Sequence, residues 1–159
     1  MQTIIIAGGI ASRLKPISDK TPKSLIKIQK KPFIEYQLKL LKKNGITDVV
    51  LCLGHFANKI KNFIGDGKKF DLKIKYSYDG NEQLGTGGAI KKAFNLLDEE
   101  FFIIYGDSFL PINFKPILKK FKKNNSDALM TIFKNENLLD KNNVLFEKKK
   151  IALYSKNKK

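Results

Sequence analysis

The sequence of 159 residues predicts an α/β fold with a mainly parallel sheet. Apolar runs typical of strands alternate along the chain with segments whose apolar residues have helical spacing, and this alternation indicates such a sheet. Three features follow expected strands: Gly8-Gly9, the loop at Gly85, and Asp107. Because open parallel sheets bind ligands at the carboxyl ends of their strands, we expect the functional residues at these turns.

Five segments are expected to be strands. Residues 2–7 form an apolar run that stops at Gly8-Gly9, which indicates a buried strand. DVVLCLG is a second buried strand, and LKIKYSY alternates as a strand should. The remaining two are FFIIYGD, before Ser108, and ALMTIFK at residues 128–134.

Four segments are expected to be helical: residues 32–44, 58–64, 85–97 and 113–123. In the first, Phe33, Tyr36, Leu40 and Leu41 have helical spacing, with Pro32 at the start and Gly45 at the stop. The third opens with glycines and is expected to bury Ala89, Ile90, Ala93, Phe94 and Leu97. From about residue 137 the pattern changes, and NNVLFEKKKIALYSK predicts a β-hairpin.

The formal net charge of +16 suggests an anionic partner. The charge is nearly all lysine and is spread along the chain beside abundant Asn and Ile, which indicates a compositional bias as much as a binding patch. Arginine, the better residue for bidentate contacts to phosphate and guanine, is almost absent. We therefore expect a polyphosphate ligand rather than nucleic acid.

Cysteine and histidine counts exclude other classes of site. The single Cys52 excludes an internal disulfide framework, and the single His55 without cysteine partners excludes the usual zinc sites. We expect Cys52 to be a packed core residue and His55 to be structural. No apolar run reaches membrane-spanning length, and the start lacks the basic region of a signal peptide, so we expect a cytoplasmic protein without membrane partners.

The turn after the first strand contains Arg13, the only arginine among 30 lysines. It matches neither the Rossmann fingerprint nor a Walker-type loop. Two prolines, Pro16 and Pro22, favour an extended, folded-over loop, and the glycines allow backbone N–H groups to approach a ligand. Arg13 and Lys23 bring two cations there, and a planar guanidinium holds phosphate with two hydrogen bonds. The alternative is a plain glycine turn with a surface arginine.

Three motifs resemble the signature of the sugar-1-phosphate nucleotidyltransferases. They are AGG-x-x-x-R-L-x-P with TPKSL, then QLGTGGAIKKA, then IIYGDS, in the order and spacing of that family. The resemblance covers most of residues 1–134, and LGTGGAI is most similar to the D-glycero-α-D-manno-heptose 1-phosphate guanylyltransferase branch. The chain departs from the family pattern at Ala11, Ser12 and Gln83, where glycine, threonine and proline are usual.

The resemblance implies a Rossmann-like, three-layer fold of the GT-A-like kind with a nucleoside triphosphate site. Arg13 would hold the phosphates, Lys23 would lie near the reacting phosphate, and Asp107 would hold Mg²⁺, which takes oxygen ligands beside substrate phosphates. Glu82 or Gln83 would read the base. The whole implied nucleotide site comprises Ala7, Gly8, Gly9, Ser12, Arg13, Glu82, Gln83, Gly85, Thr86, Gly87 and Gly88. The alternatives are a flexible helix-capping loop at Gly85 and a turn aspartate at Asp107.

The implied reaction is attack of a sugar 1-phosphate oxygen on the α-phosphorus of the triphosphate, with loss of pyrophosphate. The resemblance implies GTP as the triphosphate and surface polysaccharide synthesis as the role. The nucleophile is already an anion, so no general base is required. Catalysis then consists of positioning and charge neutralisation, which Arg13, Lys23 and an Asp107-bound Mg²⁺ could supply.

The resemblance also implies a C-terminally truncated chain. Family members continue with sugar-binding strands and a second metal-binding aspartate, whereas Lys156, which matches a lysine for the sugar phosphate, lies close to the end. We expect residues 1–134 to form the nucleotide-binding core and residues 135–159 to begin an incomplete sugar-binding region. The alternative to an active enzyme is a non-catalytic or inactive nucleotide-binding module. Unpaired strand edges would favour a homo-oligomer.

Overall fold

The computed structural model describes residues 1–9, 14, 16, 19–80, 82–124, 126–134, 143–148 and 150–155. The chain forms two compact units, Met1–Lys115 and Pro116–Lys159. The division at residue 134 between a nucleotide-binding core and the start of a sugar-binding region stays a prediction. No described helix is both long and apolar enough to cross a membrane.

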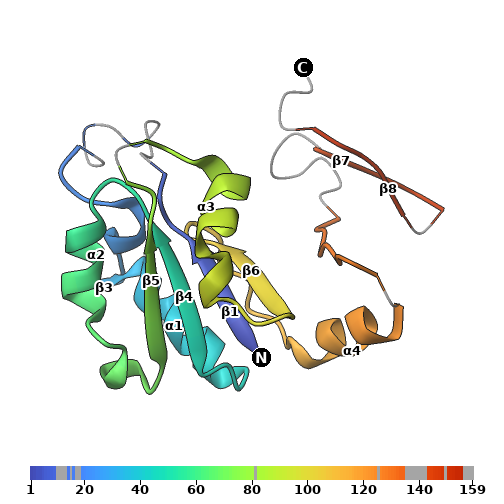
Figure 1. Ribbon diagram of the computed structural model, residues 1–159, viewed down its shortest axis with the longest axis horizontal. Helices are drawn as coiled ribbons and strands as arrows, with labels where there is room; N and C mark the ends of the chain where they lie inside the picture. Colours follow the sequence, from blue (N-terminus) through green and yellow to red (C-terminus); the bar gives the residue numbers. More distant parts are fainter. Residues whose placement is uncertain are drawn as a thin grey trace. The chain divides into compact units, whose positions relative to one another are not determined.

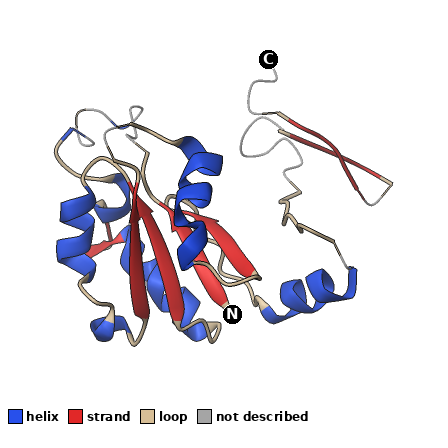
Figure 2. Cartoon of the chain, viewed as in Figure 1, coloured by secondary structure: helices blue, strands red, loops and turns tan. Residues whose placement is uncertain are grey.

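A four-stranded sheet forms the centre of the first unit (Figure 1). Its strands are β1 (Gln2–Ile6), β4 (Asp48–Leu53), β5 (Lys73–Tyr78) and β6 (Phe101–Tyr105), in the order β5-β4-β1-β6. Every pairing is parallel, so the strands point the same way and their carboxyl ends meet at one edge (Figure 2). The predicted parallel α/β fold is confirmed.

Helices cover both faces of this sheet. The helix α1 (Phe33–Lys43) lies on one face and α3 (Gly85–Ala93) lies on the other, which gives the three layers (Figure 1). The helix α2 (Ala57–Ile64) connects β4 to β5. Before α1 the chain forms a 3-10 turn, η3 (Lys23–Leu25), and two short antiparallel strands, β2 (Lys27–Ile28) and β3 (Lys31–Pro32). These short strands were not predicted.

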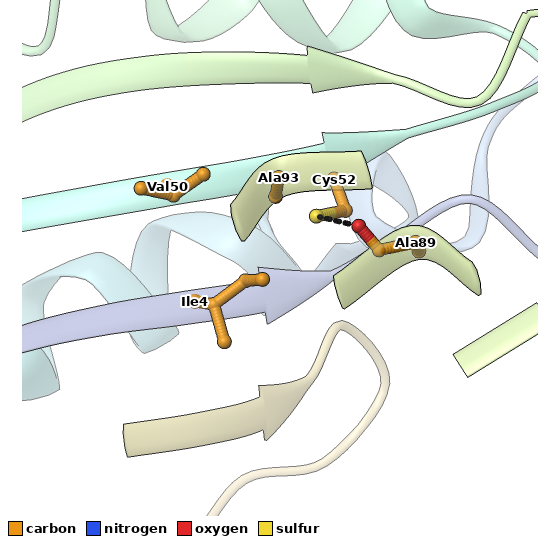
Figure 3. Packing of buried hydrophobic residues seen from close by; sticks show 5 residues of the cluster. All are labelled: Ile4, Val50, Cys52, Ala89 and Ala93. Carbon is orange, nitrogen blue, oxygen red and sulfur yellow. Dashed lines mark hydrogen bonds between the residues drawn. The ribbon is translucent and has the colours of Figure 1, made fainter. Parts of the chain in front are cut away.

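The core between α3 and the sheet is built from branched residues on the strands and alanines on the helix. Ile4, Val50 and Cys52 face Ala89 and Ala93, all of them buried (Figure 3). The Cys52 thiol donates a hydrogen bond to the Ala89 carbonyl at 3.6 Å, and burial raises the pKa of this thiol to about 11. Cys52 is a packed core residue, as predicted.

The buried face predicted for the helix at residues 85–97 is only partly right. Ala89 and Ala93 are buried, and Ile90 and Leu97 pack against them partly buried, but Phe94 is 69% exposed. The helix α3 ends at Ala93, and Phe94 begins a 3-10 turn, η5 (Phe94–Leu96). The tighter turn changes the helical spacing, which carries the Phe94 ring out of the apolar face.

In the second unit, the predicted hairpin is confirmed and the predicted strand before it is wrong. The strands β7 (Val144–Glu147) and β8 (Lys150–Tyr154) pair antiparallel. Residues 128–134 pair with no strand in the described part of the chain, and Phe133 is 74% exposed. A strand needs a neighbour for its backbone hydrogen bonds, and apolar composition alone does not supply one. The lysine-rich helix α4 (Lys115–Asn124) belongs to this unit from Pro116 onward, and its bounds are close to the predicted residues 113–123.

Candidate nucleotide site

A cavity of about 280 Å³ lies at the carboxyl edge of the sheet. The sequence-predicted residues that line it are Ala7, Gly8, Gly9, Lys23, Gln83, Gly85, Thr86 and Asp107. Ile6, Ser24, Asp79, Tyr105 and Gly106 complete the lining. The structure thus brings together residues from all three sequence motifs, because each motif follows a strand that ends at this edge.

Several predicted residues are not in this lining. Glu82, Gly87 and Gly88 are described but do not line the cavity. Arg13, Ser12 and Lys156 lie outside the described residues, so their roles stay predictions. His55 is exposed and also lies outside the lining, with its ring 4.1 Å from the ring of Phe56.

Glycine is required where the first two strand ends approach each other. A Cβ atom on Gly54, which follows β4, would lie 2.6 Å from the carbonyl oxygen of Gly8. A Cβ atom on Gly8 would lie 2.5 Å from Oδ2 of Asp79. Gly9 differs, since nothing lies within 4 Å of its Cβ position. The cavity wall is therefore closely packed backbone at Gly8, against which Gly54 lies, and has open space at Gly9.

The amino end of α3 contributes a second wall. Gly85 has φ of +65°, a conformation that glycine adopts without strain, and it starts the helix beside the cavity. The preceding Leu84 gives no side-chain cap to the helix. The first N–H groups of a helix have no partner within the helix, and the helix dipole places positive potential there. Such a terminus favours an anionic group of a ligand.

Lys23 and Asp107 form an ion pair on the cavity wall. The Lys23 Nζ and Asp107 Oδ2 atoms are 2.7 Å apart, and both side chains are nearly half exposed, at 42% and 46%. Lys23 belongs to η3, and Asp107 lies in the turn after β6. Residues 84 positions apart in the sequence thus provide a cation and a carboxylate at one place.

The donor set at this place suits Mg²⁺. The Asp107 carboxylate already faces one cation, the Lys23 ammonium, and is open to the cavity. No group of three His, Cys, Asp or Glu side chains gathers in the part of the chain that the structure describes. Mg²⁺ is commonly held by one or two carboxylates together with substrate phosphates, so one aspartate is a sufficient protein contribution.

Asp79 is a cavity residue that sequence reasoning missed. It follows β5, its side chain lines the cavity, and the residue is 8% exposed. Burial raises the pKa of its carboxyl group, and the positive charge of Lys92 acts in the opposite direction. The sequence held a signal, because an aspartate beside a glycine follows an expected strand here as it does at Asp107.

Gln37 and Ser24 were also missed. Gln37 is a buried residue of α1, and its Nε2 donates hydrogen bonds to the carbonyl oxygens of Tyr105 at 2.9 Å and Ser108 at 2.6 Å. Ser24 is 3% exposed, lines the cavity, and its Oγ has no hydrogen-bond partner among the described residues. Gln37 could have been noticed as a polar residue between the apolar positions of a helix.

Comparison with known proteins defines the class of protein. The Nucleotidyl transferase family model matches residues 2–142, so the chain belongs to this family. A D-glycero-α-D-manno-heptose 1-phosphate guanylyltransferase from Campylobacter jejuni is 39% identical over 132 residues, covering 83% of this chain and 57% of the relative. The protein with the same description from Aneurinibacillus thermoaerophilus is 36% identical, covering 76% and 52%.

Solved structures show the same fold. HddC from Yersinia pseudotuberculosis, complexed with GMP-PN, has 32% sequence identity and a TM-score of 0.67, covering 76% of this chain and 53% of HddC. The resemblance to nucleotidyltransferases noted in the sequence is thereby confirmed. The chain spans about half the length of these relatives.

Proposed function

We propose that this chain binds a nucleoside triphosphate, GTP, at the cavity and transfers its guanylyl group to a sugar 1-phosphate with release of pyrophosphate. The observation that carries the proposal is the Lys23–Asp107 ion pair at 2.7 Å, on the wall of a cavity also lined by Gly9 and Gly85. It combines a cation, a carboxylate and accessible backbone, which is what a phosphate-transfer site without a general base requires.

The residues would divide the work as follows. The Lys23 ammonium would neutralise charge on the triphosphate, and the N–H groups at the start of α3 would face an anionic part of the nucleotide. Asp107 would hold Mg²⁺, which when bound neutralises phosphate charge. The sequence adds Arg13 as a bidentate phosphate ligand. Because the sugar phosphate oxygen is already ionised, the remaining requirement is that both substrates are held in line.

Asp79 supports guanine as the base. A carboxylate accepts hydrogen bonds, and the guanine edge offers N1–H and N2–H₂ donors. Uracil and thymine offer only one donor on this edge, N3–H, which lies between two carbonyl oxygens that a carboxylate repels, whereas guanine offers two adjacent donors. Asp79 and Gln83 both line the cavity, so we propose that they read the base together. The guanylyltransferase descriptions of the two bacterial relatives agree with this choice.

Calorimetry of GTP binding tests the nucleotide part. We expect the full chain to bind GTP more tightly with Mg²⁺ than without it, and to prefer GTP to UTP. Asp107→Asn should remove the effect of Mg²⁺ while circular dichroism stays unchanged, because an amide is a much weaker ligand for this cation. Asp98→Asn, at an exposed aspartate outside the cavity lining, is the control. An Asp107→Asn protein that responds to Mg²⁺ like the parent would show that the metal assignment is wrong.

Pyrophosphate release tests the transfer step separately. The chain is incubated with GTP, Mg²⁺ and a panel of sugar 1-phosphates that includes D-glycero-α-D-manno-heptose 1-phosphate. Release that depends on one sugar and is lost in Lys23→Ala supports the enzyme. Binding of GTP without release with any sugar supports the alternative, a non-catalytic nucleotide-binding module. The link to surface polysaccharide synthesis, a cytoplasmic location and a homo-oligomer stay predictions.

A further inference from the structure

We propose that Gln37 is a positioning residue, which fixes the turn that presents Asp107 so that this carboxylate can hold the metal ion of a metal–triphosphate complex. The inference rests on the proposed function, because it assigns Asp107 to the metal. Gln37 itself is not in the cavity lining. It belongs to α1, and it acts on the cavity only through the turn after β6.

One amide group spans this turn. The Nε2 atom of Gln37 donates to the carbonyl oxygen of Tyr105 at 2.9 Å and to that of Ser108 at 2.6 Å. Tyr105 and Ser108 are the first and last residues of the turn, which is closed by the Ser108 N–H donating to the Tyr105 carbonyl at 3.1 Å. Asp107 is the third residue of the same turn. Gln37 therefore joins both ends of the four-residue segment that contains it.

The rest of the turn is held by close packing. The Gly106 N–H donates to the Ile6 carbonyl at 2.8 Å, and a Cβ atom on Gly106 would lie 2.8 Å from the Ala7 Cβ. On the far side of the turn, the rings of Phe33 and Tyr36 contact Phe109 edge-on, at centroid distances of 6.4 and 6.5 Å. Phe33, Tyr36 and Gln37 have i, i+3, i+4 spacing, so one side of α1 makes both the ring contacts to Phe109 and the two hydrogen bonds to the turn.

The placement of Gln37 is costly for a residue with only a packing role. It is 3% exposed and lies among the buried apolar residues of α1, Ile34, Leu38 and Leu41. Its Oε1 atom is buried and has no hydrogen-bond partner in the described part of the chain. An unsatisfied buried acceptor lowers stability, and an apolar side chain of similar size would avoid this penalty. The two donated hydrogen bonds are what an apolar residue could not replace.

The test compares two buried glutamines in the full chain. Gln37→Met keeps the size of the side chain and removes both hydrogen bonds to the turn. The matched control is Gln2→Met: Gln2 is 2% exposed, donates to the Leu96 carbonyl at 3.0 Å and accepts from the Asp98 N–H at 2.9 Å. Gln2 lies at the opposite end of β1 from the cavity, so its loss tests general destabilisation.

The readouts are Mn²⁺ binding in the presence of GTP, followed by electron paramagnetic resonance, and GTP affinity without metal. Residues that hold a metal ligand in place typically contribute about 10–100-fold to metal affinity. We expect a loss of this size in Gln37→Met, with metal-free GTP affinity unchanged. Gln2→Met should lower the melting temperature and leave both affinities at the parent values.

Failure of this inference and failure of the proposed function give different results. A parent chain that binds GTP without any effect of Mn²⁺, or an Asp107→Asn variant with full Mn²⁺ binding, overturns the metal assignment and this inference with it. A parent that responds to Mn²⁺ while Gln37→Met responds equally overturns the role of Gln37 alone. If Gln37→Met does not fold, amide exchange at Ser108 in Gln37→Glu decides: exchange as slow as in the parent overturns the role.

Discussion

At the scale of single residues, two glycines at neighbouring strand ends differ in whether a side chain would fit. Gly54→Ala would bring a Cβ atom to 2.6 Å from the backbone of Gly8, which cannot move without disturbing the first strand end. Overpacking of this kind typically costs about 1–3 kcal/mol. We expect urea denaturation to show such a loss for Gly54→Ala, because two backbone segments meet there.

Gly9→Ala is the counterpart, since the space around its Cβ position is open. We expect its stability to stay within about 0.5 kcal/mol of the parent. GTP affinity should fall nevertheless, because the added methyl group would lie on the cavity wall where a ligand approaches the backbone. Unchanged GTP affinity in Gly9→Ala would mean that the ligand does not approach this turn.

Asp79 should lower stability at neutral pH in exchange for its place in the cavity. Burial raises the pKa of its carboxyl group in the folded chain. Between the ordinary aspartate pKa and this raised value, the folded chain binds a proton that the unfolded chain has released, so this group's contribution to stability is lost as the pH rises. Asp79→Asn should therefore be more stable than the parent at pH 7, and the difference should shrink as the pH falls through this window.

Urea denaturation from pH 4 to 8 measures this effect, with Glu99→Gln, an exchange at an exposed carboxylate, as the control. Calorimetry on the same Asp79→Asn protein tests the base assignment, since an amide can donate to a carbonyl oxygen and should weaken the preference for GTP over UTP. If the stability of Asp79→Asn depends on pH as the parent's does, the Asp79 carboxylate is solvated. If Asp79→Asn prefers GTP over UTP as strongly as the parent does, Asp79 does not contact the base.

The site residues that were predicted from sequence belong to local motifs, whereas the site residues that were missed depend on contacts with distant parts of the chain. Lys23, Gly85 and Asp107 belong to motifs and follow strands or turns, so their meeting could be expected. Gln37 reaches the site through the backbone of a turn far along the chain, and only a folded structure shows which carbonyls it meets. Asp79 has a visible position after β5, but its burial depends on the backbone of Gly8 and Gly54.

At the scale of elements, α3 is a helix that begins with glycines. Helix stability favours alanine at these positions, whereas ligand binding beside the helix favours glycine. Gly87 lies within the helix with nothing within 4 Å of its Cβ position. Glycine inside a helix typically costs about 0.5–1 kcal/mol relative to alanine. We expect Gly87→Ala to raise the free energy of unfolding by this amount and to weaken GTP binding, because the first turn of α3 adjoins the cavity.

Chemical denaturation and calorimetry on the same Gly87→Ala protein check both parts of this expectation. Gly88→Ala is a contrasting variant, since its Cβ atom would lie 2.8 Å from the Cβ of Leu84 and should remove the gain in stability. A Gly87→Ala protein that is more stable and binds GTP like the parent would show that GTP binding does not require glycine at this position.

Elements were predictable from sequence where local pattern and tertiary contacts agree. Parallel strands buried on both faces read as apolar runs, and β1 and β4 were found for this reason. The ALMTIFK segment has the same composition but no partner strand among the described residues, and β2 and β3 have two residues each, too few to give a period. Pairing partners and 3-10 turns are decided by distant contacts that a local pattern does not contain.

At the scale of the whole molecule, the net charge and the cavity lead to two different kinds of binding. The net charge of +16 will attract polyanions of many kinds, and this attraction weakens steeply with salt. The cavity instead brings particular groups to one edge of one sheet. Nucleic-acid binding that is lost on adding salt, beside GTP binding that persists, would assign the first to charge and the second to the site.

The placement of the cavity within one unit leads to a prediction about where GTP acts. All residues that line it lie in Met1–Lys115, while the hairpin of β7 and β8 belongs to Pro116–Lys159. We expect hydrogen exchange followed by mass spectrometry to show that GTP with Mg²⁺ slows exchange at residues 1–9, 82–88 and 105–109. These segments carry the glycine turn, the start of α3 and the Asp107 turn, whose amides gain protection when a ligand holds them.

Exchange in the hairpin should not change, which makes it an internal reference in the same sample. Asp107→Asn should lose the part of the protection that requires Mg²⁺ and keep the rest. Protection confined to the hairpin, or spread evenly over the chain, would contradict a nucleotide site at the carboxyl edge of the sheet.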